Sequence, residues 1–214
     1  MGYSLKNKKI LITCGPTWVP IDAVRVVSNI SSGALGQRVA LDCARSGAKV
    51  TLLEGPVAVP LSSRSIRILK FCFFDELQKL LKQELRKDID AVIHAAAVAD
   101  YKLKRPVRHK LASAKKTLRL EFVATPKLIR TVKRLAPKAF LAGFKLEPHI
   151  SRKSARRKAR ELFREADCDV VVANALTARG YKGFILDKDD ALLASAAGRA
   201  KMSKALVRIL SEQL

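Results

Sequence analysis

The sequence predicts an α/β fold of the Rossmann-like, doubly wound class, with a mostly parallel sheet and a small antiparallel flap. Apolar strand segments alternate with helical segments along most of the chain, which is typical of this class. Aromatic residues make up only 6% of a chain that is 49% hydrophobic, so Val, Ile, Leu and Ala must build the core, as in parallel sheets. The 214 residues are enough for one full core, and we treat residues 1–214 as a single domain.

The N-terminal fifty residues contain a strand, a glycine-bearing loop, a helix and a second strand. The apolar run 9–14 predicts a buried strand, and Gly15 with Pro16 ends it. Residues 33–46 carry apolar side chains with helical period, and residues 49–53 form the next strand. Gly33 and Gly36 lie at the start of this helix, where free amide groups can bind a phosphate.

The remaining elements are predicted in the same way. Asp75 is expected to cap a helix together with Gln78, and Thr125 to cap another in which Pro126 is the first residue. The N-terminus of that second helix is another candidate anion site. Further strands are expected at 66–71, 90–97, 118–123, 139–144 and 169–173, a late hairpin at 184–186 with 191–194, and helices at 151–165 and 203–214. The segment near Leu118 and the late hairpin are expected to form the flap.

The formal charge of +23 suggests polyanionic partners, which are either nucleic acid or small phosphorylated substrates. No zinc finger, RNA-binding strand signature or helix-turn-helix pattern is present, so we do not expect dedicated nucleic-acid binding. The four cysteines have no metal spacing and indicate reduced thiols in a cytoplasmic protein. No apolar run is long enough to cross a membrane, and we expect no membrane association.

The side chains at the predicted strand ends are suited to stabilise charge. Asn29 offers an uncharged amide donor, and Arg25 offers a planar fork for phosphate or carboxylate. Asp100 could hold Mg²⁺ or a ribose hydroxyl, and Lys110 could reach a nucleotide phosphate. No catalytic Ser/His/Asp set, paired carboxylates or P-loop is evident, and the three histidines match no metal triad. The inventory favours group transfer through an anionic transition state. Residues 102–116 are either a lid over a phosphorylated ligand or a solvated loop.

At these residues the chain resembles phosphopantothenate–cysteine ligase, also called phosphopantothenoylcysteine synthetase. In bacteria this is usually the C-terminal half of a bifunctional coenzyme A biosynthesis flavoprotein. Two motifs carry the resemblance, one from Gly15 to Gly33 and one from Ala96 to Tyr101. The pairs Gly143-Phe144 and Ala173-Asn174, together with Glu147, fit later family motifs.

The resemblance implies a reaction in two steps. The carboxylate of 4′-phosphopantothenate attacks the α-phosphate of CTP in the presence of Mg²⁺ and releases pyrophosphate. The amine of cysteine then attacks the acyl-cytidylate and releases CMP. The flavin-binding half of the bifunctional protein is absent from these residues, so no FMN is expected in this chain.

The resemblance also assigns site residues. Asn29, Arg25 and Lys110 take the positions of the family's catalytic residues. Asp100 is assigned to the nucleotide-binding site and is also the candidate Mg²⁺ ligand. The other positions assigned to the nucleotide are Gly15, Ser31, Ser32, Gly33, Ala96, Ala97, Pro126, Lys127, Leu128, Ile129 and Phe144.

The chain departs from the family pattern at several positions. Trp18 and Val19 replace an Arg-Glu pair, and Ala34 replaces a lysine. Of the family's K-x-K-K motif only Lys110 remains, in the run from Lys110 to Ser113. Two nucleotide-binding lysines align with Leu162 and Ala166, where the nearby Lys158 or Arg164 would be substitutes. The choice between CTP and ATP therefore stays open.

Two other functions remain as alternatives. A Rossmann-type NAD(P)-binding reductase would need an acidic residue after the second strand, and Glu54 lies there, but the fingerprint glycines are missing. A non-catalytic basic paralogue would bind nucleotides or nucleic acid with strong salt dependence. The resemblance implies a homodimer, because family members dimerise, and it gives a separate flavoprotein decarboxylase as a second candidate partner.

Overall fold

The computed structural model describes residues 3–112, 116–178 and 180–214 and contains one eight-stranded sheet. The strand order is β12-β11-β10-β9-β6-β1-β4-β5. Six adjacent strands, β10, β9, β6, β1, β4 and β5, are parallel to one another. Strand β11 is antiparallel to both of its neighbours, β10 and β12. Chain order reverses between β1 and β6, as in doubly wound sheets.

The elements follow the predicted alternation. The sheet strands are β1 (Lys9–Cys14), β4 (Lys49–Glu54), β5 (Ile66–Lys70), β6 (Ala91–His94), β9 (Phe140–Leu146), β10 (Val170–Thr177), β11 (Gly180–Asp187) and β12 (Leu192–Ala197). The helices are α1 (Ala34–Arg45), α2 (Phe74–Glu84), α3 (Ile129–Leu135), α4 (Arg152–Ala166) and α5 (Arg199–Gln213).

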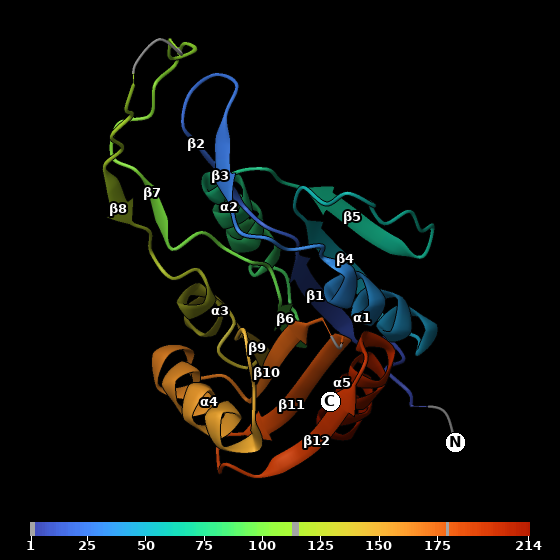
Figure 1. Cartoon of the computed structure of the whole chain (residues 1–214). Helices are drawn as coiled ribbons and strands as arrows, with labels where there is room; N and C mark the ends of the chain where they lie inside the picture. Colours follow the sequence, from blue (N-terminus) through green and yellow to red (C-terminus); the bar gives the residue numbers. More distant parts are fainter. Residues whose placement is uncertain (1–2, 113–115, 179) are drawn as a thin grey trace.

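The helices cover both faces of the sheet, giving three layers (Figure 1). On one face α1 and α5 pack side by side and bury Val39 and Leu206 among others, with α1 over β1 and β4 and α5 over β11 and β12. On the other face α2, α3 and α4 bury Leu77, Val132 and Ala159. Buried alanines on α1 and α4, such as Ala40 and Ala159, let these helices lie close to the sheet.

Two small antiparallel ribbons project beyond the sheet (Figure 1). In one, β2 (Trp18–Pro20) pairs with β3 (Val26–Ser28), and in the other β7 (Tyr101–Leu103) pairs with β8 (Phe122–Ala124). The predicted flap is therefore wrong in its composition, because the late hairpin β11–β12 extends the main sheet instead. The strand expected at 118–123 is limited to the short β8.

Three helix starts also differ from the prediction. Helix α2 begins at Phe74, where Glu76 accepts hydrogen bonds from the Cys72 and Phe73 amides, so Asp75 is not its cap. Thr125 does not cap α3, because its hydroxyl donates to the carbonyl of Ala99. Helix α5 starts four residues before the expected position. In the described part of the chain, no helix is long and apolar enough to span a membrane.

Candidate functional site

A cleft of about 490 Å³ lies along the carboxyl ends of the parallel strands. It includes the point between β1 and β6 where chain order reverses, which is where open α/β sheets bind ligands. Most of the residues assigned to the nucleotide line it: Ser31, Ser32, Gly33, Ala96, Ala97, Asp100, Pro126, Lys127, Leu128, Ile129 and Phe144. Four segments that are far apart in the sequence therefore meet at one site.

The N-terminus of α1 opens into this cleft. Gly33 precedes the helix with a φ of 68°, a left-handed conformation that favours glycine, and no side chain caps the helix end. The hydroxyls of Ser31 and Ser32 lie a long 3.4 Å from the Gly33 and Ala34 amides, and the first turn has no acidic residue. This helix end could therefore offer amide groups to an anion, and anion binding here stays a prediction.

The loop after β6 is held in place by the end of β1 and by Asn29. The Ala96 amide donates to the Thr13 hydroxyl, and the Ala97 amide to the carbonyl of Gly15. The amide nitrogen of Asn29 lies 3.3 Å from the carbonyl oxygen of Ala97 and 3.2 Å from that of Val98. We predicted Asn29 as a donor to the ligand, but its donor nitrogen bonds the backbone. Its carbonyl oxygen Oδ1 is the group left for a ligand.

Asp100 and Lys127 form an ion pair at the rim of the cleft, with Nζ 2.7 Å from the carboxylate. Both side chains are about half exposed, and the carboxylate raises the pKa of Lys127. No group of three potential metal ligands occurs among the described residues. The residues present fit a Mg²⁺ ion that binds together with the nucleotide phosphates and takes Asp100 as its one protein ligand. This arrangement is common for Mg²⁺.

His94 lies at the floor of the cleft and is almost fully buried. Its Nδ1 is 3.1 Å from the hydroxyl of Thr13, and that hydroxyl already accepts from the Ala96 amide. Burial lowers the pKa of His94 to about 4, so the ring is neutral at pH 7. This buried position suits a structural role for His94.

The buried His94 predicts a loss of stability in weak acid. Its folded pKa lies below the ordinary value of 6.5, so the unfolded chain binds a proton that the native protein excludes. As the pH falls from 7 to 5, this group should cost about 2 kcal/mol of stability. Urea unfolding at both pH values should show the loss, and His94→Gln should remove most of it. An unchanged pH dependence in the variant would contradict this assignment.

Two of the three predicted catalytic residues, Arg25 and Lys110, do not line the cleft in the described structure. The third, Asn29, does line it. The guanidinium of Arg25 forms an ion pair with Asp22, with Nε 2.9 Å from Oδ2, and also donates to the carbonyl of Leu111. The Leu111 amide donates to Asp22 at 3.0 Å. Arg25 thus anchors the segment that carries Lys110 instead of facing a phosphate. Residues 102–112 form part of a projecting arm, and Ser113 lies outside the described residues.

Several cleft residues were not predicted. Lys145, Leu146, Glu165, Leu176, Tyr181 and Arg199 line it together with Asn174, whose motif the sequence had indicated. The carboxyl ends of β9 and β10 give the signal for most of these positions. Gly15 is absent from the lining, and its carbonyl instead holds the Ala97 amide.

Helix α4 carries the two apolar departures but supplies no cation to the cleft. Leu162 lines the cleft and Ala166 is buried beneath it. The suggested substitutes do not face the cleft: Lys158 pairs with Glu147 and Glu161, and Arg164 donates to the backbone of α4. The cationic side chains that line the cleft are Lys127, Lys145 and Arg199.

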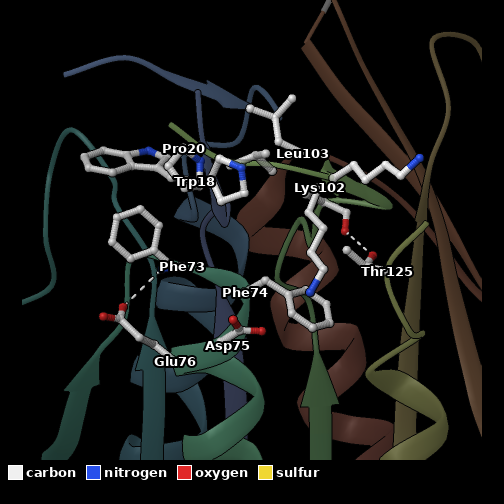
Figure 2. Close-up of a pocket in the computed structure, with 13 residues that line it drawn as sticks. Trp18, Pro20, Phe73, Phe74, Asp75, Glu76, Lys102, Leu103 and Thr125 are labelled. Carbon is white, nitrogen blue, oxygen red and sulfur yellow. Dashed lines mark hydrogen bonds between the residues drawn. The ribbon is translucent and has the colours of Figure 1, made fainter. Parts of the chain in front are cut away.

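The departures at Trp18 and Val19 fall outside this cleft. They line a separate pocket of about 420 Å³ between β2, the start of α2 and β7. Figure 2 shows the rings of Trp18 and Phe73 at one end of this pocket and Thr125 at the other. These two substitutions therefore do not alter the residues that line the cleft.

Glu54 argues against the reductase alternative. Its side chain is completely buried at the end of β4. The carboxylate accepts from Gln37 at 2.7 Å and from the Leu61 amide at 3.1 Å, and it pairs with Lys70. A dinucleotide-binding acidic residue must reach the ribose hydroxyls, and this carboxylate cannot.

Comparison with known proteins gives a consistent result. Residues 5–212 match the family described as DNA/pantothenate metabolism flavoprotein C-terminal domain. The coenzyme A biosynthesis bifunctional protein CoaBC of Thermococcus kodakarensis is 34% identical over 212 residues, covering 99% of this chain and 51% of that protein. CoaBC of Escherichia coli is 33% identical over 158 residues, covering 72% and 38%. The chain therefore spans about half the length of the curated relatives it matches.

Solved structures share the fold. The crystal structure of the C-terminal domain of CoaBC is 25% identical and has a TM-score of 0.81, covering 99% of this chain and 97% of that one. The DNA/pantothenate metabolism flavoprotein of Streptococcus pneumoniae has a TM-score of 0.86 at 23% identity, covering 97% and 100%. The family match extends over nearly the whole chain and includes the residues that line the cleft. The protein thus belongs to the family of DNA/pantothenate metabolism flavoprotein C-terminal domains.

Proposed function

We propose that this protein is a phosphopantothenate–cysteine ligase acting in coenzyme A biosynthesis. It would activate the carboxylate of 4′-phosphopantothenate with CTP and transfer the acyl group to cysteine. The observation that carries the proposal is the single cleft in which the four predicted nucleotide segments meet. Family membership supports the same reaction class.

In the first step the substrate carboxylate attacks the α-phosphorus of CTP, a P–O bond forms, and pyrophosphate leaves. Both reactants are anions, so their repulsion must be offset. Lys127 and the free amides at the start of α1 supply positive charge in the cleft. Asp100 would hold a Mg²⁺ ion that binds with the nucleotide, and the chemistry this ion would supply is neutralisation of negative charge.

In the second step the unprotonated amine of cysteine attacks the acyl carbonyl carbon. The amide bond forms, the C–O bond to the phosphate breaks, CMP leaves, and the amine gives up a proton to solvent. The amide nitrogen of Asn29 bonds to the carbonyls of Ala97 and Val98, whereas its Oδ1 has no hydrogen-bond partner among the described residues. This oxygen would accept a hydrogen bond from the amine and orient it toward the carbonyl.

The test is a pyrophosphate-release assay with the purified chain, Mg²⁺, 4′-phosphopantothenate and cysteine. We expect release with CTP that depends on the pantothenate substrate. A parallel reaction with ATP decides between the two nucleotides. Absence of release with both would contradict the ligase, and a change in NADPH absorbance would instead favour a reductase.

We also propose that the chain forms a homodimer through the β2–β3 ribbon. All three residues of β3 are exposed, and Ile30 nearby is 99% exposed. Exposed apolar side chains along an unpaired strand edge favour association with a second copy. Light scattering should give twice the mass of the chain, and Val27→Lys should shift it to the monomer.

A further inference from the structure

The part of the cleft beside the start of α5 contains residues to which the proposed reaction assigns no role. Arg199 is the first residue of this 15-residue helix and lines the cleft together with Asn174 and Tyr181. The guanidinium of Arg199 lies 5.9 Å from the centre of the Tyr181 ring. Within the described structure Arg199 pairs with no carboxylate. Its charge is therefore available to a ligand.

The helix end itself is open. Gly198 precedes α5 with a φ of 91°, no side chain caps the helix, and its first turn carries no acidic residue. The first amide groups of such a helix have no partner within the helix and carry partial positive charge. An anion placed beside Arg199 would gain both the guanidinium and these amides.

A second observation points to a ligand at the same place. Asn174 is only 8% exposed, yet its side-chain amide makes no hydrogen bond with any residue that the structure describes. It lines the cleft and is not one of the fully enclosed unpartnered atoms, so the amide faces the cleft. The adjacent hydroxyl of Tyr181 is enclosed and has no partner among the described residues. Native structures rarely leave such groups unsatisfied.

The chemistry of these groups selects the ligand. The Arg199 guanidinium can only donate hydrogen bonds, and the Asn174 amide can donate two. Burial raises the pKa of Tyr181, so the ring beside Arg199 stays neutral and adds no negative charge. A dense set of donors with a permanent positive charge suits a phosphoryl group.

We propose that Arg199, Asn174 and the N-terminus of α5 form a phosphoryl-binding subsite, separate from the one at the start of α1. The assignment to a substrate rests on the proposed ligase function. The phosphoryl group would come either from the phosphomonoester of 4′-phosphopantothenate or from the β- and γ-phosphates of the nucleotide.

The first test needs no turnover. Titration of the ¹⁵N-labelled protein with inorganic phosphate and with pyrophosphate should shift the amide resonances of residues 199–201. Arg199→Met should weaken this site about tenfold, the loss expected for one charge-assisted contact. Asn174→Asp, which is nearly isosteric, should weaken it further through charge repulsion. The exposed Lys204 on the same helix provides the matched control, Lys204→Met, which should bind as the wild type does.

Two results would overturn the subsite. One is a set of shifts confined to residues 33–36, and the other is an equal loss in Lys204→Met and Arg199→Met. Because binding is read directly, these results stand even if the wild type shows no ligase turnover, which would contradict only the proposed function.

Kinetics of Arg199→Met identify the source of the phosphoryl group. A rise in KM for 4′-phosphopantothenate alone assigns the subsite to the phosphomonoester, and a rise in KM for CTP alone assigns it to the nucleotide. A KM unchanged for both, in an enzyme that turns over, would overturn the subsite.

Discussion

Replacing Asn29 with alanine is expected to lower product formation at least ~100-fold, the usual cost of removing one hydrogen-bonding group from a reaction centre. The variant loses Oδ1, which we assign to the cysteine amine, and it loses both contacts with the loop after β6. Pyrophosphate release in a single turnover should fall much less than the final product. The acyl-cytidylate should therefore accumulate, and rapid quench followed by chromatography would detect it.

Two further variants separate these roles. Ser28→Ala is the matched control, because Ser28 is an exposed neighbour that does not line the cleft and whose hydroxyl bonds only the backbone carbonyls of Thr17 and Asn29. It should retain nearly full activity. Asn29→Asp keeps an acceptor oxygen but loses the donor nitrogen, so it reports on the loop contacts. Equal turnover in Asn29→Ala and the wild type would remove Asn29 from the mechanism.

The doubly wound sheet and most of the cleft could be predicted from the sequence. Several parallel strands end in small or polar residues, such as the alanines after β6 and Asn174 in β10, and these ends meet at one edge. Residues placed at those ends therefore come together without any knowledge of side-chain contacts. This explains why Ala96, Lys127 and Phe144 share one cleft.

The departures from prediction depend on longer-range contacts. The sequence places the cation of Arg25 near a glycine-bearing loop. It does not reveal the contact of Arg25 with Leu111, which is 86 residues further along the chain. Arg199 was missed because the helical period was read from Ser203, although Gly198 could have indicated the helix start. A glycine with positive φ is compatible with many turns, so local sequence alone does not decide between them. The same limit applies to Thr125, whose hydroxyl bonds Ala99 and not the helix.

Replacing Asp22 with asparagine is expected to release the arm that carries Lys110. Asp22 is almost fully buried, and its Oδ2 accepts from Arg25 Nε and from the Leu111 amide. Asparagine retains the shape and one oxygen but replaces the other with a donor, so both contacts are lost. Each hydrogen bond to a charged group is strong enough that its loss should raise local opening about tenfold. Hydrogen exchange at Leu111 and tryptic cleavage after Lys110 would measure this change.

The matched control is Glu121→Gln, which breaks the exposed ion pair with Lys104 on the same arm. Exposed pairs contribute little, so exchange and cleavage should stay close to those of the wild type. The pH dependence gives an independent check. The Arg25 guanidinium and several amides hold the pKa of Asp22 well below its usual range. The contacts should therefore persist at neutral pH and in weak acid, and they should be lost only as the pH falls through that depressed pKa. If Asp22→Asn and Glu121→Gln gave the same exchange rates, Asp22 would not anchor the arm, and the position of Lys110 would need another cause.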